Sequence, residues 1–152
     1  MNELSELYEE IILDHNRRPR HFDKIPVGSN REAEGHNPLC GDHYEVHLKV
    51  NNGIVEDVGF SGAGCAISKA SASLMLESVL GKSEAEIETL FNHVHEMLTG
   101  DEADTTEDHH DLGKLEVLGG VRKYPMRVKC AALAWHILNA ALHNSEETVT
   151  ME

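Results

Sequence analysis

Residues 42–60 read DHYEVHLKVNNGIVEDVGF and alternate apolar and polar side chains in their first half. The even positions from 44 to 50 are apolar and the odd positions 43 to 49 are polar, which is typical of a strand with one buried face. Asn52 and Gly53 follow, and this dipeptide favours a two-residue hairpin turn because both residues tolerate positive φ. Residues 54–60 supply the returning strand. This stretch therefore predicts a β-hairpin.

Apolar residues at helical spacing lie on both sides of this hairpin. Helices are predicted over about residues 3–17, from Ile67 to Gly81, from a capping box of Ser83 and Glu86 to Gly100, briefly over 112–118, and over about 127–142. Residues 17–37 show no period and are predicted as a loop. Residues 101–111 hold six acids and no Lys or Arg, which indicates a solvated insertion.

The order of these elements predicts an α+β fold, in which helices pack on one face of a small antiparallel β-sheet. A chain of 152 residues is about the length of one domain. We expect that single domain to cover residues 1–143, with an acidic insertion at about 100–122. Residues 144–152 are predicted to form a flexible acidic tail.

Charge and hydropathy exclude several classes of function. The net charge of −14 would repel a nucleic-acid backbone and an anionic membrane surface, so neither is an expected partner. No apolar run approaches the roughly 20 residues of a membrane span, and the first residues resemble no secretory signal. A cytoplasmic location is therefore predicted.

The three cysteines are expected to be reduced in the cytoplasm, which raises the question of metal binding or thiol chemistry. Cys40 and Asp42 flank a glycine and point to the same side of an extended chain. Asp42 also shares the parity of the buried strand positions, where an unpaired carboxylate is costly. Cys65 precedes a predicted helix and Cys130 falls in the first turn of another, where free N–H groups favour the thiolate.

Two interpretations of these residues remain open on spacing alone. Three thiolates and a carboxylate can hold a tetrahedral zinc, or two irons of a cluster, and Arg127 with Lys129 could offset the negative charge. However, Cys130 lies on the apolar stripe of its helix, where a buried cysteine is commonly a packing residue. The spacings also contain no CxxC pair and match no zinc finger.

Three segments resemble the U-type iron–sulfur assembly proteins, in particular their SufU branch. They are NPLCGD at 37–42, FSGAGCAISKASAS at 60–73 and YPMRVKCA at 124–131. The likeness covers nearly everything from residue 4 to 142, and it implies a SufE/IscU-like fold with metal ligands at Cys40, Asp42, Cys65 and Cys130. Lys129 stands where the IscU branch carries histidine, and that branch's Leu-Pro-Pro-Val-Lys chaperone motif is absent, which favours the SufU branch.

The resemblance implies a zinc-dependent sulfurtransferase-type carrier in iron–sulfur cluster assembly rather than a stand-alone enzyme. Such a carrier takes persulfide sulfur from a pyridoxal-phosphate cysteine desulfurase of the SufS type and passes it to a downstream scaffold or apo-proteins. Cys40 would accept the sulfur, Asp42, Cys65 and Cys130 would stay as metal ligands, and Arg127 would give electrostatic support. The desulfurase is expected to dock on the basic residues 17–24 or on the rim of the ligand site.

Two alternatives use the same residues. In the first, the protein is a scaffold that assembles a labile [2Fe–2S] cluster on Cys40, Asp42, Cys65 and Cys130 and transfers it to apo-proteins. In the second, it is a purely structural zinc domain in which no cysteine accepts sulfur.

Overall fold

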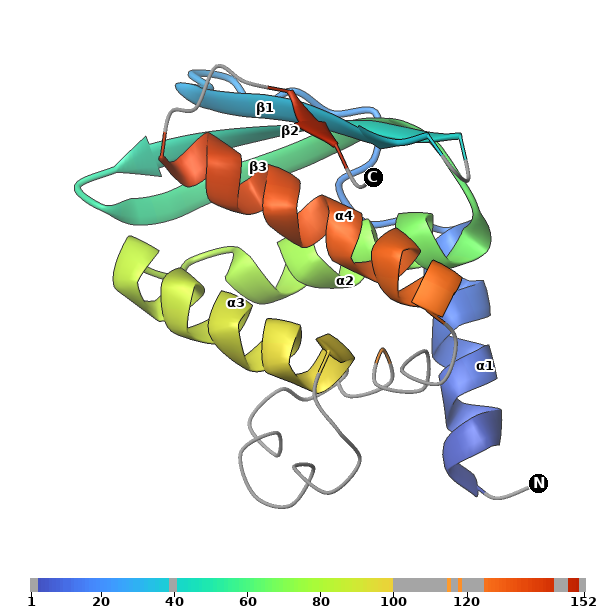
Figure 1. Cartoon of the computed structure of the whole chain (residues 1–152). Helices are drawn as coiled ribbons and strands as arrows, with labels where there is room; N and C mark the ends of the chain where they lie inside the picture. Colours follow the sequence, from blue (N-terminus) through green and yellow to red (C-terminus); the bar gives the residue numbers. More distant parts are fainter. Residues whose placement is uncertain are drawn as a thin grey trace.

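The computed structural model describes residues 3–38, 41–99, 115, 118, 125–143 and 148–150. Within them the elements are α1 (Glu3–Arg17), β1 (Arg31–Asn37), β2 (Asp42–Asn51), β3 (Ile54–Ala63), α2 (Ala66–Val79), α3 (Glu84–Thr99), α4 (Pro125–Leu142) and β4 (Val149–Thr150). The helices lie on one side of the sheet (Figure 1). The predicted α+β class, with helices on one face of a small sheet, is confirmed. None of the described helices combines the length and apolar composition of a membrane span.

The sheet is built around the predicted hairpin. Its strand order is β3-β2-β1-β4, and β2 pairs antiparallel with β3 so that Val46 lies opposite Phe60. Asn52 and Gly53 both have positive φ, 54° and 78°, as the two-residue hairpin turn requires. The inner face of this hairpin lies against α4 and α2, so the strands that carry the core also position the residues at their ends.

Strand β1 corrects the prediction of a loop over residues 17–37. It pairs antiparallel with β2 along its whole length. The inner positions of β1 are small or polar, so no apolar alternation marks it. Gly35 shows why a larger side chain is not found at an inner position of β1: a Cβ there would lie 2.7 Å from Cγ1 of Ile137 on α4. Small residues in this strand allow the helix to approach the sheet closely.

The C-terminal end of the chain also differs from its prediction. Val149 and Thr150 belong to the segment predicted as a flexible tail, yet they form β4, which pairs parallel with β1. Val149 packs against the core, which accounts for the pairing, and the sheet is mixed rather than purely antiparallel. The predicted insertion at 100–122 lies outside the described residues apart from Leu115 and Leu118, whose side chains are buried.

Four of the predicted helices are found close to their predicted positions, with one consequential shift, and the short helix predicted over 112–118 lies outside the described residues apart from Leu115 and Leu118. The capping box of α3 is present, since the Ser83 N–H donates to Glu86 Oε1 at 3.1 Å and the Glu86 N–H donates to Ser83 Oγ at 3.2 Å. Helix α4 begins at Pro125, two residues earlier than expected. The prediction that Cys130 falls in the first turn of its helix is therefore wrong, and Cys130 lies in the second turn.

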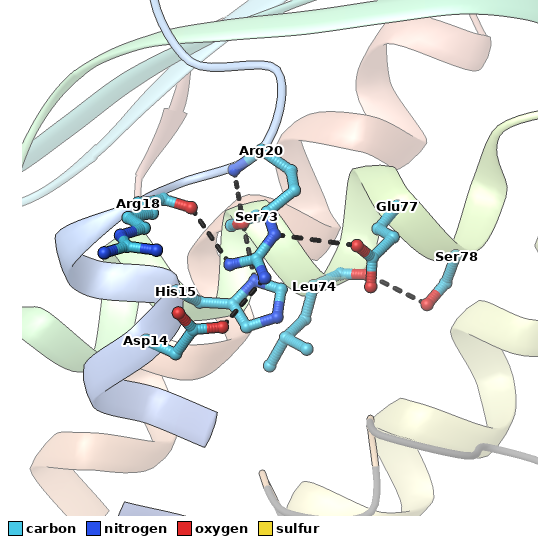
Figure 2. Close-up of polar contacts among 8 residues, drawn as sticks. All are labelled: Asp14, His15, Arg18, Arg20, Ser73, Leu74, Glu77 and Ser78. Carbon is cyan, nitrogen blue, oxygen red and sulfur yellow. Dashed lines mark hydrogen bonds and ion pairs between the residues drawn. The ribbon is translucent and has the colours of Figure 1, made fainter. Parts of the chain in front are cut away.

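The buried Ser73, in the middle of α2, forms hydrogen bonds with α1 and with the chain segment that follows it (Figure 2). Ser73 Oγ accepts the backbone N–H of Arg20 at 2.8 Å and lies 2.7 Å from His15 Nδ1. Both Ser73 and His15 are buried. The Arg20 guanidinium adds contacts to Asp14 Oδ2 at 2.8 Å and to Glu77 Oε2 at 3.8 Å. One hydroxyl thus joins two helices and the segment between α1 and β1.

Ser73→Ala is expected to lower the free energy of unfolding by about 2 kcal/mol, because it removes a hydroxyl that bonds the buried His15 ring and the half-buried Arg20 N–H. For a domain of this size that corresponds to a fall in melting temperature of roughly 4–8 °C. The control is Ser78→Ala, since Ser78 Oγ only donates back to the Leu74 carbonyl of its own helix. Thermal unfolding followed by circular dichroism should separate the two variants. Equal melting temperatures would show that the Ser73 contacts contribute little.

Candidate metal centre

Three of the four predicted ligands meet where the sheet joins two helices. Asp42 begins β2, Cys65 directly precedes α2, and Cys130 projects from α4. Their ligand atoms all lie within 4.8 Å of one another. Ligands at about 2.0–2.3 Å from a tetrahedral zinc are separated by roughly 3.3–3.8 Å, so a small contraction would enclose an ion. Asp42 and Cys130 are buried and Cys65 is half-buried.

The two carboxylate oxygens of Asp42 have different environments. Oδ1 accepts the backbone N–H of Cys65 at 2.8 Å. Oδ2 is buried, and no hydrogen-bond donor reaches it within the described part of the chain. A buried carboxylate oxygen without a donor is costly unless a cation compensates it. The carboxylate is therefore oriented through one oxygen and offers the other to a metal.

Cys65 is the N-cap of α2, as its position in the sequence suggested. Its backbone is extended, with φ −74° and ψ 170°, and its Sγ accepts the Ser68 N–H at 3.4 Å. The sulfur therefore takes the place of the side-chain oxygen that usually caps a helix and lies among the free N–H groups of the helix start. The sequence-based interpretation of Cys65 is consistent with this geometry.

Cys130 has a different environment from the one its predicted position implied. Because α4 begins two residues earlier than expected, Cys130 lies beyond the first turn, where the free N–H groups of a helix start are found. Instead, Asn37 Nδ2 lies 4.0 Å from Cys130 Sγ and donates a weak hydrogen bond to it. Asn37 is buried at the end of β1. Sequence reasoning missed this residue, although it opens the NPLCGD segment.

A hydroxyl pair beside Cys65 was also missed. Tyr44 OH lies 2.9 Å from Ser68 Oγ, and both side chains are buried. Burial, together with the negative charges of Asp42 and the two cysteines, raises the pKa of Tyr44, so its phenol stays neutral and retains its proton. The alternation of β2 predicts that Tyr44 points inward, but not which group its hydroxyl meets.

Gly64 leaves the space that this cluster needs. A Cβ at Gly64 would lie 2.5 Å from both Tyr44 OH and Ser68 Oγ, and 2.6 Å from Asp42 Oδ1. Any side chain here would displace the hydroxyl pair or the carboxylate. The small-residue segment before α2 therefore allows the strand end and the helix start to meet.

The remaining predicted site residues are Cys40 and Arg127. Cys40 lies outside the described residues, so its role as a ligand and sulfur acceptor stays a prediction. Next to it, Gly41 is exposed and has a φ of 74°. Arg127 is exposed in the first turn of α4, and its electrostatic role also stays a prediction.

The fold and this cluster together define a class of protein. It is an α+β domain with two thiol groups and one carboxylate converging at the start of a strand and beside two helices. Thiolates select zinc or the irons of a cluster over magnesium or calcium. The donor set and the unmatched oxygen of Asp42 fit such a metal.

Comparison with known proteins gives the family. The chain belongs to the family of the NifU-like N-terminal domain, whose model matches residues 7–131. It is 37% identical over 145 residues to the iron–sulfur cluster assembly scaffold protein IscU of Streptococcus pyogenes, covering 95% of this chain and 88% of that protein. It is 38% identical over 143 residues to the zinc-dependent sulfurtransferase SufU of Bacillus subtilis, covering 94% of each chain.

A solved structure agrees with these relatives. The crystal structure of a putative iron–sulfur cluster assembly scaffold protein for the SUF system, from Fervidobacterium islandicum, superposes with a TM-score of 0.81. Its sequence is 33% identical, and the match covers 90% of this chain and 97% of that one. The resemblance noted from the sequence is confirmed at the level of family and fold.

Proposed function

We propose that this protein acts in iron–sulfur cluster assembly as a zinc-bound sulfur acceptor for a cysteine desulfurase. The observation that carries the proposal is the convergence of Asp42, Cys65 and Cys130, with one carboxylate oxygen buried and unmatched. Cys40 completes the proposed ligand set. The 38% identity to a relative named as a zinc-dependent sulfurtransferase supports zinc over a redox-active metal. A cytoplasmic location is part of the same proposal.

Zinc would keep the thiolates deprotonated and has no redox chemistry of its own. The protein's own residues are then proposed to act either as fixed metal ligands or in sulfur transfer. Asp42, oriented by the Cys65 N–H, and Cys65, held as a helix N-cap, are fixed ligands. Cys130 is fixed by burial in α4. Cys40 is the proposed acceptor, and Arg127 is proposed to offset part of the negative charge.

The transfer step balances without an added oxidant or reductant. The Cys40 thiolate attacks the outer sulfur of the desulfurase persulfide and forms a new S–S bond. The S–S bond of the desulfurase persulfide breaks, and its cysteine leaves as a thiolate. The product is a persulfide on Cys40, ready for a downstream scaffold or apo-protein.

A scaffold for a labile [2Fe–2S] cluster is the second candidate. Relatives named as scaffold proteins favour it, and so does the donor set. A hard carboxylate oxygen is a poor match for cluster iron, so a cluster held partly by Asp42 would be easily released.

Of the two predicted docking surfaces for the desulfurase, we propose the rim of the ligand site. Two cations of the basic segment 17–24 are engaged within the fold, since Arg20 contacts Asp14 and Glu77, and Lys24 Nζ lies 2.6 Å from Asp57 Oδ1. Their charge is already partly neutralised. These contacts support docking at the rim, next to the exposed Gly41, rather than on the basic segment.

Metal analysis and visible absorption of protein purified without oxygen test the proposal. A colourless protein with one zinc per chain is the expected result. Iron with acid-labile sulfide and visible colour would favour the scaffold function instead. Protein that binds neither metal under both zinc-replete and iron-replete growth would contradict both functions.

A further inference from the structure

The hydroxyls of Tyr44 and Ser68 form a short chain that ends on Cys65. Tyr44 OH lies 2.9 Å from Ser68 Oγ, which in turn lies 3.6 Å from Cys65 Sγ. The Ser68 N–H approaches the same sulfur at 3.4 Å. The Tyr44 ring packs against Phe60, with centroids 6.0 Å apart, so the phenol is held in place from the sheet side.

The protons of the two hydroxyls can be assigned by elimination. If Ser68 donated to Tyr44, the phenol proton would need a different acceptor. Among the described residues, Ser68 Oγ is the only hydrogen-bond partner of Tyr44 OH, so that proton would have none. A buried donor without an acceptor is costly, so Tyr44 donates to Ser68. The Ser68 proton is then available to the Cys65 carbonyl at 3.0 Å or to Cys65 Sγ.

The choice between these two acceptors depends on the state of the sulfur. The Cys65 carbonyl already accepts the Lys69 N–H at 3.1 Å. A thiol can donate to Ser68 Oγ, which leaves the Ser68 proton on the carbonyl. A thiolate carries a negative charge and attracts the Ser68 proton, adding a second donor to the backbone N–H. The hydroxyl pair thus accommodates both forms of Cys65.

We propose that Tyr44 and Ser68 are positioning residues that hold Cys65 as a thiolate ligand by hydrogen bonding through the Ser68 hydroxyl. This inference rests on the proposed metal site and identifies a determinant of its strength. Hydrogen-bond partners of metal ligands typically contribute 10–100-fold to metal affinity. Because they also withdraw electron density from the sulfur, their loss changes the metal–thiolate bond itself.

The test uses the Tyr44→Phe variant, which keeps the ring and removes only the hydroxyl. Zinc affinity measured by competition with a chelator should fall, though by less than the roughly 10-fold or more expected for Ser68→Ala, because only the Ser68 hydroxyl contacts the sulfur directly. In protein loaded with cobalt(II), the thiolate-to-metal charge-transfer band should move to longer wavelength, since the Ser68 hydroxyl is a weaker donor to the sulfur once it no longer accepts the Tyr44 proton, and a less strongly hydrogen-bonded sulfur gives up an electron more readily. Ser68→Ala should shift the band in the same direction. Ser68→Thr, which keeps a hydroxyl at this position, should have the wild-type spectrum.

Two comparisons keep the result interpretable. Ser73→Ala is the matched control, because it removes a buried hydroxyl from the same helix without touching Cys65 and should leave the cobalt spectrum unchanged. The double variant Tyr44→Phe/Ser68→Ala should be no weaker in zinc binding than Ser68→Ala alone, since the two groups act in series. If Tyr44→Phe has the same cobalt spectrum and zinc affinity as the wild type, the proposed role of Tyr44 and Ser68 is wrong, but the metal site still stands. A wild-type protein without a cobalt–thiolate band would overturn the metal site as well.

Discussion

Cys130→Ser is expected to lose zinc and to melt at a markedly lower temperature. A ligand that binds only the folded state at about 1,000 times its dissociation constant adds about 4 kcal/mol. Loss of that binding corresponds to a fall in melting temperature of roughly 8–16 °C for a domain of this size. Cys65→Ser is expected to behave alike, because both sulfurs are fixed by the helices that carry them.

Chelator-treated wild-type protein provides the control for this experiment. A chelator should lower the melting temperature of the wild type towards that of Cys130→Ser, and should have no further effect on the variant. Zinc content is measured on the same samples. Unchanged zinc content and melting temperature in either variant would show that these residues do not share a metal.

Cys40→Ser is expected to abolish sulfur acceptance while leaving the fold intact. The three described ligands are each restrained, since Asp42 is bound to the Cys65 backbone, Cys65 caps α2, and Cys130 is buried. Cys40 lies in the sequence between exposed Pro38 and exposed Gly41. Among the described residues, no atom outside Gly41 and its two chain neighbours lies within 4 Å of the position that a Gly41 Cβ would take, so Gly41 is open on that side.

The measurement for Cys40 maps the added sulfur directly. The protein is incubated with its desulfurase and cysteine, and peptides are analysed by mass spectrometry under non-reducing conditions. An additional sulfur is expected on the Cys40 peptide only. Finding it on Cys65 or Cys130 with Cys40 unmodified, or normal acceptance by Cys40→Ser, would show that the roles are assigned wrongly.

The sequence predicted those elements whose side-chain pattern matches their burial. The β2–β3 hairpin has clear alternation and a diagnostic turn, and α3 has a capping box, so both were predictable. Strand β1 was not, because it faces the helices with small and polar residues such as Gly35 and Asn37. Its place in the sheet depends on the close approach of α4, which no local pattern reveals.

The candidate site was likewise predictable only in part. Asp42 was predictable because a carboxylate at a buried strand position requires a partner. Cys130 remained ambiguous in the sequence, since a ligand and a packing cysteine look alike on an apolar helix stripe. Asn37, Tyr44 and Ser68 acquire their roles only through contacts between distant segments. Such contacts are a property of the tertiary structure and not of residue spacing.

The unequal oxygens of Asp42 have a consequence for selectivity among metals. Because Oδ1 already accepts a backbone N–H and Oδ2 has no donor among the described residues, Oδ2 is the oxygen expected to bind a metal, and the carboxylate would then be monodentate. Calcium prefers six to eight oxygens and often uses both atoms of a carboxylate, and magnesium requires an octahedral shell. A single hydrogen bond from the start of α2 thus favours a low coordination number at the proposed site, which suits zinc better than calcium.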